Sequence, residues 1–135
     1  MNRHPYLRAY MAGIAVPTML MLVGLTFFCV ARFRYHVPFP IERLLVFPMT
    51  LVPNAWGLWN MLYVRLHARL HVPIGVHGAL LLAPLLPTAY VIQRVTDLMI
   101  WTPTLVVIAF PVAVVLYYLA WKHLVGFFNE LLGIA

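Results

Sequence analysis

Histidine is the residue type in this sequence whose spacing most directly suggests metal chemistry. His67 and His71 are four residues apart, so on a helix both imidazoles would lie on one face, with His77 as a third candidate ligand for zinc. Pro73 interrupts a helix through all three positions. The arginines of this segment repel a divalent cation, and no carboxylate lies nearby to compensate. The sequence therefore favours a solvated, lipid-facing basic turn, and it predicts no metal site.

A bound haem is a second interpretation of the histidines. Haem ligation by two imidazoles needs one histidine from each of two helices at a similar depth, and His77 with His123 is the pair that the sequence places in this way. Both positions lie close to the predicted membrane surface. We therefore expect no haem and no other cofactor.

The acidic residues limit the reactions that this chain could support. Glu42, Asp97 and Glu130 are the only carboxylates, and each falls at the end of a predicted helix. A proton-coupled antiporter of the small four-helix type depends on a carboxylate in mid-membrane, so this class is disfavoured. No Ser-His-Asp arrangement, HExxH motif or phosphate-binding loop occurs, so the sequence predicts no catalytic residues and favours a role other than an enzyme.

Amides and hydroxyls form the remaining polar set. Thr50, Asn54 and Gly57 recur at spacings of four and three, so they share one helical face, whereas Asn60 lies on another. Together with Thr88 from the next hydrophobic segment, the two asparagines and Thr50 are our candidates for lining a pore or forming a polar interface. The alternative is that these side chains join helices through hydrogen bonds, as Asn and Thr commonly do in membranes.

The elements that carry these residues follow from the distribution of charge. Of the 135 residues, 64% are hydrophobic and only 9% are charged, and the mean hydropathy is +0.94. This composition excludes a soluble enzyme, a disordered tail and a secreted disulfide scaffold. About 20 apolar residues suffice for a helix to cross a bilayer. The stretches between charges predict four transmembrane helices, approximately at 9–31, 44–64, 74–93 and 102–122, with 123–135 as an extension of the last helix or a helix on the surface.

The predicted fold is a single domain, 1–135, in which these helices form an all-α, up-down-up-down bundle with short loops. Prolines fall inside every crossing, at Pro17, Pro48, Pro53, Pro84, Pro87 and Pro111. Each proline removes a backbone donor and frees a carbonyl, which predicts kinked helices whose freed carbonyls line a cavity. The alternative is that proline is simply common in membrane helices.

Basic residues indicate the orientation of the chain. The side that would hold both termini and the second loop has Arg3, Arg8, Arg65, Arg69 and Lys122, and the other side has Arg32, Arg34, Arg43 and Arg94. Because cytoplasmic loops are richer in Lys and Arg, this slight excess predicts an inner (plasma) membrane protein with both termini cytoplasmic. A near-tie is also what a dual-topology protein would show. The predicted headgroup contacts are Arg3, Arg8, Arg32, Arg34, Arg65 and Arg69.

The net charge of +6 points to lipid phosphates as partners, because the arginines flank hydrophobic crossings, and nucleic acid is not expected. Four helices barely enclose a water-filled path, so conduction would require several copies. The leading expectation is an oligomeric channel or carrier for a small neutral or anionic solute. The alternative is a non-catalytic subunit or assembly factor of a larger membrane complex. A haem-binding or lipid-handling membrane protein is less favoured.

Overall fold

A computed structural model describes residues 3–38, 41–96 and 102–134, and for residues 43, 44 and 46–48 it describes the backbone alone. Within these ranges all the regular structure is helical, so the expected all-α class is confirmed. The predicted helix ends at Asp97 and Trp101 lie outside the described residues.

The first helix, α1, spans Pro5–Arg34 and extends a few residues beyond both ends of the predicted crossing. Pro5 starts it, in the first turn, where a missing N–H costs no hydrogen bond. Pro17 lies inside the helix and is buried, yet helical structure continues through it to Arg34. At the other end the backbone N–H of Tyr35 donates to the Ala31 carbonyl at 3.2 Å.

The second helical segment runs without a break from 41 to 70, in three parts. These are α2 (Ile41–Val46), the π-helical turn η1 (Phe47–Leu51) and α3 (Val52–Leu70). Pro48 lies in this wide turn and Pro53 two residues beyond it, and neither has an N–H to donate. The Thr50 hydroxyl donates to the Leu45 carbonyl five residues back, at 2.8 Å. The disturbance that the prolines predict in this helix therefore takes the form of a π turn. Such turns occur where the backbone hydrogen bonds of a helix are interrupted.

The third segment is divided into α4 (Ile74–Leu80) and α5 (Leu82–Val95). At the junction the N–H of Leu81 donates to the Gly78 carbonyl at 3.1 Å, a bond to the third residue back. Pro84 lies just beyond and has no N–H for the Leu80 carbonyl. The helix is thus tightened one turn before its first proline.

The last segment is again continuous, with α6 (Pro103–Leu119), the π-helical turn η2 (Ala120–Val125) and α7 (Gly126–Leu131). Thr102 caps its start, because its Oγ1 accepts a hydrogen bond from the Leu105 N–H at 3.3 Å. The tail beyond 122 therefore continues the fourth helix as far as Leu131.

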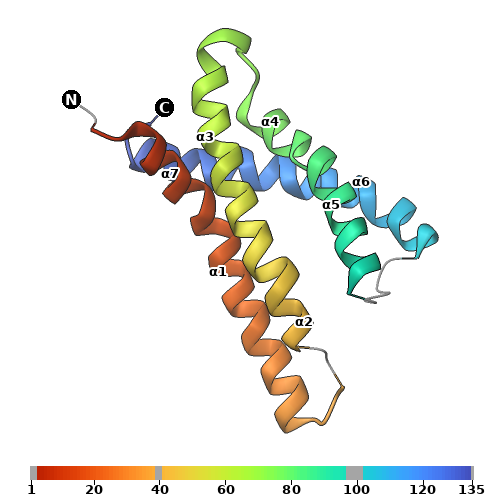
Figure 1. The fold of residues 1–135 in the computed structure, drawn as a ribbon. Coiled ribbons are helices and arrows are strands. Elements are labelled where there is room, and N and C mark those ends of the chain that lie inside the picture. The colour runs from red at the N-terminus through yellow and green to blue at the C-terminus, as the bar shows by residue number, and fades with distance from the viewer. Residues whose placement is uncertain (1–2, 39–40, 97–101, 135) are drawn as a thin grey trace.

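In space, α1 and α3 lie side by side and antiparallel, while α4 and α5 diverge from them (Figure 1). The long helix of α6, η2 and α7 crosses this pair at a steep angle and brings α7 against α1 (Figure 1). Both chain termini lie at the end of the molecule where α3 ends. Side chains from four segments meet at the crossing and form the core: Val16, Val52, Trp56, Leu81, Trp121 and Val125.

In the part of the chain that the structure describes, three helical stretches are long and apolar enough to cross a membrane: Pro5–Arg34, Ile74–Val95 and Pro103–Leu131. The segment 41–70 is of similar length but is not one of them, and Asn54 and Asn60 lower its hydropathy. None of the residues of α6 is buried. Much of the described apolar surface thus faces outward, which in water would be exceptional.

Candidate functional site

The asparagine predicted on a separate face, Asn60, is fully buried and pairs with Asn129 of α7. Its Nδ2 donates to Asn129 Oδ1 at 2.7 Å, and Asn129 Nδ2 donates back to Asn60 Oδ1 at 3.1 Å. Asn60 Nδ2 also donates to the Ala9 carbonyl of α1 at 2.7 Å. This amide pair therefore joins three helices, the second of the two roles that the sequence left open.

The sequence reasoning missed Asn129 as a functional residue, although a signal was present. Trp121, Val125 and Asn129 recur every four residues, and all three are buried. An amide that continues an apolar stripe needs a polar partner from another helix. The partner's identity depends on the crossing of α7 over α1 and α3, which no local pattern specifies.

Glycines set the distance at which α1 and α3 approach one another. A Cβ added at Gly13 would lie 2.6 Å from the Trp56 carbonyl oxygen and 2.8 Å from the Gly57 Cα. A Cβ added at Gly57 would lie 2.6 Å from Tyr10 Cδ2 and 2.7 Å from Ile14 Cγ2. Backbone contact at this point is what allows the Asn60 amide to reach the Ala9 carbonyl.

Two other predicted residues form a polar seam on the outside of the α1–α3 pair, which we define as Tyr10, Thr50 and Asn54. The Tyr10 hydroxyl donates a hydrogen bond to Asn54 Oδ1, and Asn54 Nδ2 donates to the Thr50 carbonyl at 2.7 Å. Thr50 and Asn54 are exposed, and Tyr10 is half-buried. The seam thus presents an amide and a hydroxyl on the outer surface of the helix pair.

The fourth predicted residue, Thr88, lies apart from the other three. Its Oγ1 donates to the Pro84 carbonyl four residues back in α5, at 2.8 Å, so this hydroxyl is satisfied within its own helix. Because Asn60 is in the core and Thr50 and Asn54 are on the outer seam, the four candidates do not converge on one path through the described chain.

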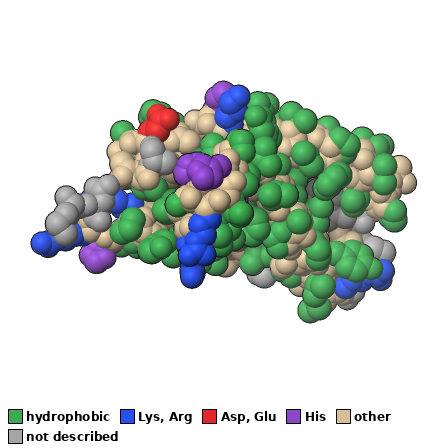
Figure 2. All heavy atoms as spheres, turned by 90° about the horizontal axis from the view of Figure 1, so that it is seen from above, with side chains coloured by type: hydrophobic (Ala, Val, Ile, Leu, Met, Phe, Trp, Pro, Cys, Tyr) green, Lys and Arg blue, Asp and Glu red, His purple; other side chains and the backbone are tan. Residues whose placement is uncertain are grey.

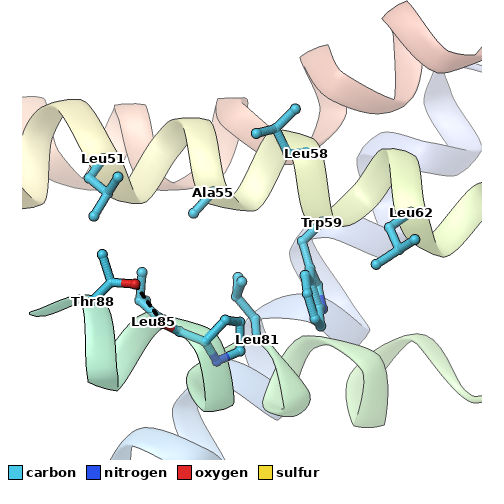
Figure 3. Close-up of a pocket in the computed structure, with 9 residues that line it drawn as sticks. Leu51, Ala55, Leu58, Trp59, Leu62, Leu81, Leu85 and Thr88 are labelled. Atoms are coloured by element: carbon cyan, nitrogen blue, oxygen red, sulfur yellow. Dashed lines mark hydrogen bonds between the residues drawn. The ribbon is translucent and has the colours of Figure 1, made fainter.

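Thr88 instead lines a groove of about 310 Å³ between α3 and the α4–α5 segment (Figure 3). Leu51 of η1 and Ala55 of α3 face Thr88 and Leu85 across it, and Trp59 points between the two segments (Figure 3). Its lining is formed by Leu51, Ala55, Leu58, Trp59, Leu62, Leu81, Pro84, Leu85 and Thr88. Since Thr88 is the single polar side chain in this lining, the groove suits an apolar guest.

His77 is packed into a ring of aromatic side chains. The ring centroids of Trp59 and Tyr63 are each 5.2 Å from the imidazole, and that of Trp121 is 5.9 Å away. His77 Nε2 lies 3.1 Å from the Trp59 carbonyl oxygen, while Trp59 Nε1 donates to the His77 carbonyl at 2.7 Å. A carbonyl oxygen only accepts, so Nε2 carries the proton and donates this bond. Through these ring contacts and hydrogen bonds, His77 joins α4 to α3.

The other histidines do not assemble a ligand set with His77. His123 is exposed on η2, and His67 packs on Tyr63 with ring centroids 4.9 Å apart. His71 ends α3 in the left-handed conformation, at φ 49°. Among residues 3–38, 41–96 and 102–134, no three His, Cys, Asp or Glu side chains lie close enough to hold a metal ion.

The predicted headgroup arginines fall at both ends of the molecule. Viewed from the end at which α3 terminates, Lys, Arg and His side chains stand out from a largely hydrophobic surface (Figure 2). Arg3, Arg65 and Arg69 are exposed, and Arg8 donates to the Leu132 carbonyl at 3.3 Å. At the opposite end Arg34 is exposed.

Arg32, the sixth of these arginines, pairs with Glu42, with Nη1 and Oε1 2.7 Å apart. A hydrogen bond from its own backbone, and then the Arg32 guanidinium, hold the pKa of the Glu42 carboxyl below its ordinary value. The ion pair closes the connection between α1 and α2.

The described chain therefore offers three distinct features: a buried amide pair that joins helices, an exposed polar seam, and an apolar groove beside exposed arginines. Hydrogen bonding and apolar contact are the chemistry that these groups can supply. No protein-family model, curated protein or solved structure is found to match the chain.

Proposed function

We propose that this chain is an integral membrane protein with four crossings, made by the three apolar helices and by the predicted crossing 44–64 within the more polar segment 41–70. Three apolar helices of sufficient length support the proposal, and so does the length of 41–70. An even number of crossings returns the chain to its starting side, in keeping with the two termini at one end of the molecule (Figure 1). The proposed location is the inner (plasma) membrane, with both termini cytoplasmic.

Within that membrane, the function that the geometry supports best is a non-catalytic subunit or assembly factor of a larger membrane complex. The single observation that carries it is the exposed polar seam. Asn54 lies at the middle of the predicted crossing 44–64, where an amide facing hydrocarbon is costly. Its bonds to Tyr10 and Thr50 use one of its two amide N–H groups. A helix of another chain at this seam would remove the amide from lipid and accept its remaining hydrogen bond.

A second candidate is the oligomeric channel or carrier for a small neutral or anionic solute. The observation that favours it is that Thr50 and Asn54 are both exposed and lie on adjacent parts of one helix. Several copies arranged around an axis would bring their seams together and line a path between subunits. In this case the polar residues face water and other copies, in place of a different protein.

Substitution of Asn54 by leucine separates these two functions. The subunit proposal expects Asn54→Leu to reduce the amount of partner chain recovered with the protein from its native membrane by about tenfold, corresponding to about 1.4 kcal/mol. The channel proposal expects the homo-oligomer to survive while solute flux in liposomes falls or changes selectivity.

Thr26→Leu is the matched control, because Thr26 is an exposed residue of α1 whose hydroxyl bonds to its own helix at Leu22. The control should leave both partner recovery and flux unchanged. If Asn54→Leu behaves in the same way as this control in both assays, the polar seam is not an interface and both proposals fail.

A further inference from the structure

One face of α3 connects the apolar groove to two exposed cations. The groove residues on this face are Ala55, Leu58 and Leu62, and Leu51, the last residue of η1, precedes them with the same spacing. Arg65 and Arg69 continue the same spacing of three and four residues towards the end of the helix. At 3.6 residues per turn, all six positions fall within about 80° of one another around the helix axis. The stripe is therefore apolar for most of its length and cationic at one end.

The cationic end of this stripe has no acidic partner in the described part of the chain. Arg65 and Arg69 are exposed, and the ion pair within the described ranges, Arg32 with Glu42, lies at the opposite end of the α1–α3 pair. Two guanidinium groups one helical turn apart suit a phosphate, whose oxygens accept several charge-assisted hydrogen bonds. In the proposed topology, Arg65 and Arg69 lie just beyond the crossing 44–64, at the level of lipid headgroups.

The dimensions of the groove fit one hydrocarbon chain. From Leu51 to Leu62 the helix rises by about 16 Å, close to half of the hydrocarbon core of about 30 Å. Dividing the volume of about 310 Å³ by this length gives a mean cross-section of about 20 Å². A polymethylene chain, whose carbons contact neighbours at about 3.5–4.0 Å, occupies a similar section. A helix with its side chains is about 10–12 Å across and is too wide.

We propose that α3 and α5 form a binding site for one anionic phospholipid of the phosphatidylglycerol type. The phosphate lies between Arg65 and Arg69, and one acyl chain extends along the groove towards Leu51 and Thr88. This inference requires that the chain lies in a membrane. It is independent of whether the polar seam contacts another protein or another copy, because Asn54 lies outside the groove lining.

Native mass spectrometry of the full chain in detergent tests the site. The protein is titrated with phosphatidylglycerol, with phosphatidylcholine of the same acyl chains, and with inorganic phosphate. We expect one tightly bound phosphatidylglycerol, with an affinity at least tenfold above that of phosphatidylcholine and no displacement by phosphate at similar concentration. The double variant Arg65→Gln, Arg69→Gln should weaken phosphatidylglycerol binding by about 10- to 30-fold. The control is the double variant Arg3→Gln, Lys122→Gln, which removes the same charge at the same end of the molecule. It should change the affinity for phosphatidylglycerol less than threefold.

A second pair of variants tests the groove. Ala55→Phe places a ring between α3 and α5, in the space proposed for the acyl chain. It should weaken the binding of both lipids about tenfold without changing the ratio of their affinities. Ala83→Phe adds the same ring at an exposed position outside the groove and should have no effect.

Three outcomes overturn the proposal. The first is equal binding of the two lipids to the unsubstituted protein, and the second is a loss in the Arg65, Arg69 variant no larger than in its control. The third is a crosslink from Ala55→Cys to another protein chain in the native membrane, which would assign the groove to a partner helix.

Discussion

At the residue scale, the polar side chains of this protein separate into those that hold the fold and those that face outward. Asn60 has 0% of its surface exposed and Asn129 has 1%, and each donates to the other. The polarity of the segment 44–64 could be predicted from the sequence, and so could the need of its amides for partners. Which of Asn54 and Asn60 is buried could not be predicted, because the two lie on different faces of one helix and the neighbours of each face follow only from the packing of the other helices.

Removing one member of the amide pair should destabilise the crossing of α7 over α1 and α3. Asn60→Leu leaves Asn129 and the Ala9 carbonyl without their partner in a buried site, which costs about 1–3 kcal/mol of unfolding free energy. Asn60→Leu combined with Asn129→Leu should recover part of this loss, with a coupling energy of about 0.6–1.7 kcal/mol. Chemical unfolding in detergent, followed by circular dichroism, measures all four corners of the cycle. Strictly additive losses would show that the two amides do not interact.

At the element scale, the distribution of charge predicts the helices but not their irregularities. The stretches between charged residues correspond to α1, 41–70, α4 with α5, and α6 to α7. The observed helices exceed the predicted crossings because Arg, His and Tyr at the ends are compatible with helix outside the hydrocarbon. The sequence predicts disturbance at the prolines, yet proline alone does not determine whether a helix tightens, as at Leu81, or widens, as at Phe47–Leu51.

Gly78 fixes the distance between α4 and η2. A Cβ at Gly78 would overlap the side chain of Trp121, which is fully buried and has no space to move into. Gly78→Ala should therefore lower the unfolding free energy by about 1–3 kcal/mol through overpacking. Gly24→Ala is the control, because nothing lies within 4 Å of the added Cβ, and it should stabilise α1 by up to about 1 kcal/mol. If Gly78→Ala left the unfolding free energy unchanged, α4 and η2 would not be in contact.

At the scale of the whole molecule, the arrangement of the helices is what the sequence determines least. α6 is apolar on every side and buries none of its residues, so no stripe on it indicates a neighbour or a crossing angle. The packing that does occur depends on glycines and asparagines far apart in the chain, such as Gly13 with Gly57 and Asn60 with Asn129. These pairs depend on how the helices are arranged in space, which no local pattern in the sequence specifies.

The proposed orientation can be measured with single cysteines in a Cys29→Ala background. Tyr35→Cys, beyond the end of α1, should react with a membrane-impermeant maleimide in intact cells. Tyr6→Cys and Leu70→Cys, at the other end, should react only after permeabilisation. All three positions are exposed, so burial does not limit the reaction. Partial reaction of all three in intact cells would contradict a single orientation and indicate dual insertion.

The π turn η2 has a consequence for how this sequence can change in length. A π turn holds one residue more than the α-helical ladder requires, so losing one residue from 120–125 would restore regular helix. Because each residue of a π turn winds the helix by less than an α-helical residue does, the residues beyond would keep their orientation around the helix axis. Asn129 would therefore still face Asn60. The same deletion in regular α-helix, between Gly126 and Phe128, would rotate Asn129 by about 100°. Single-residue deletions within 120–125 should thus be far less damaging than single-residue deletions between Gly126 and Phe128.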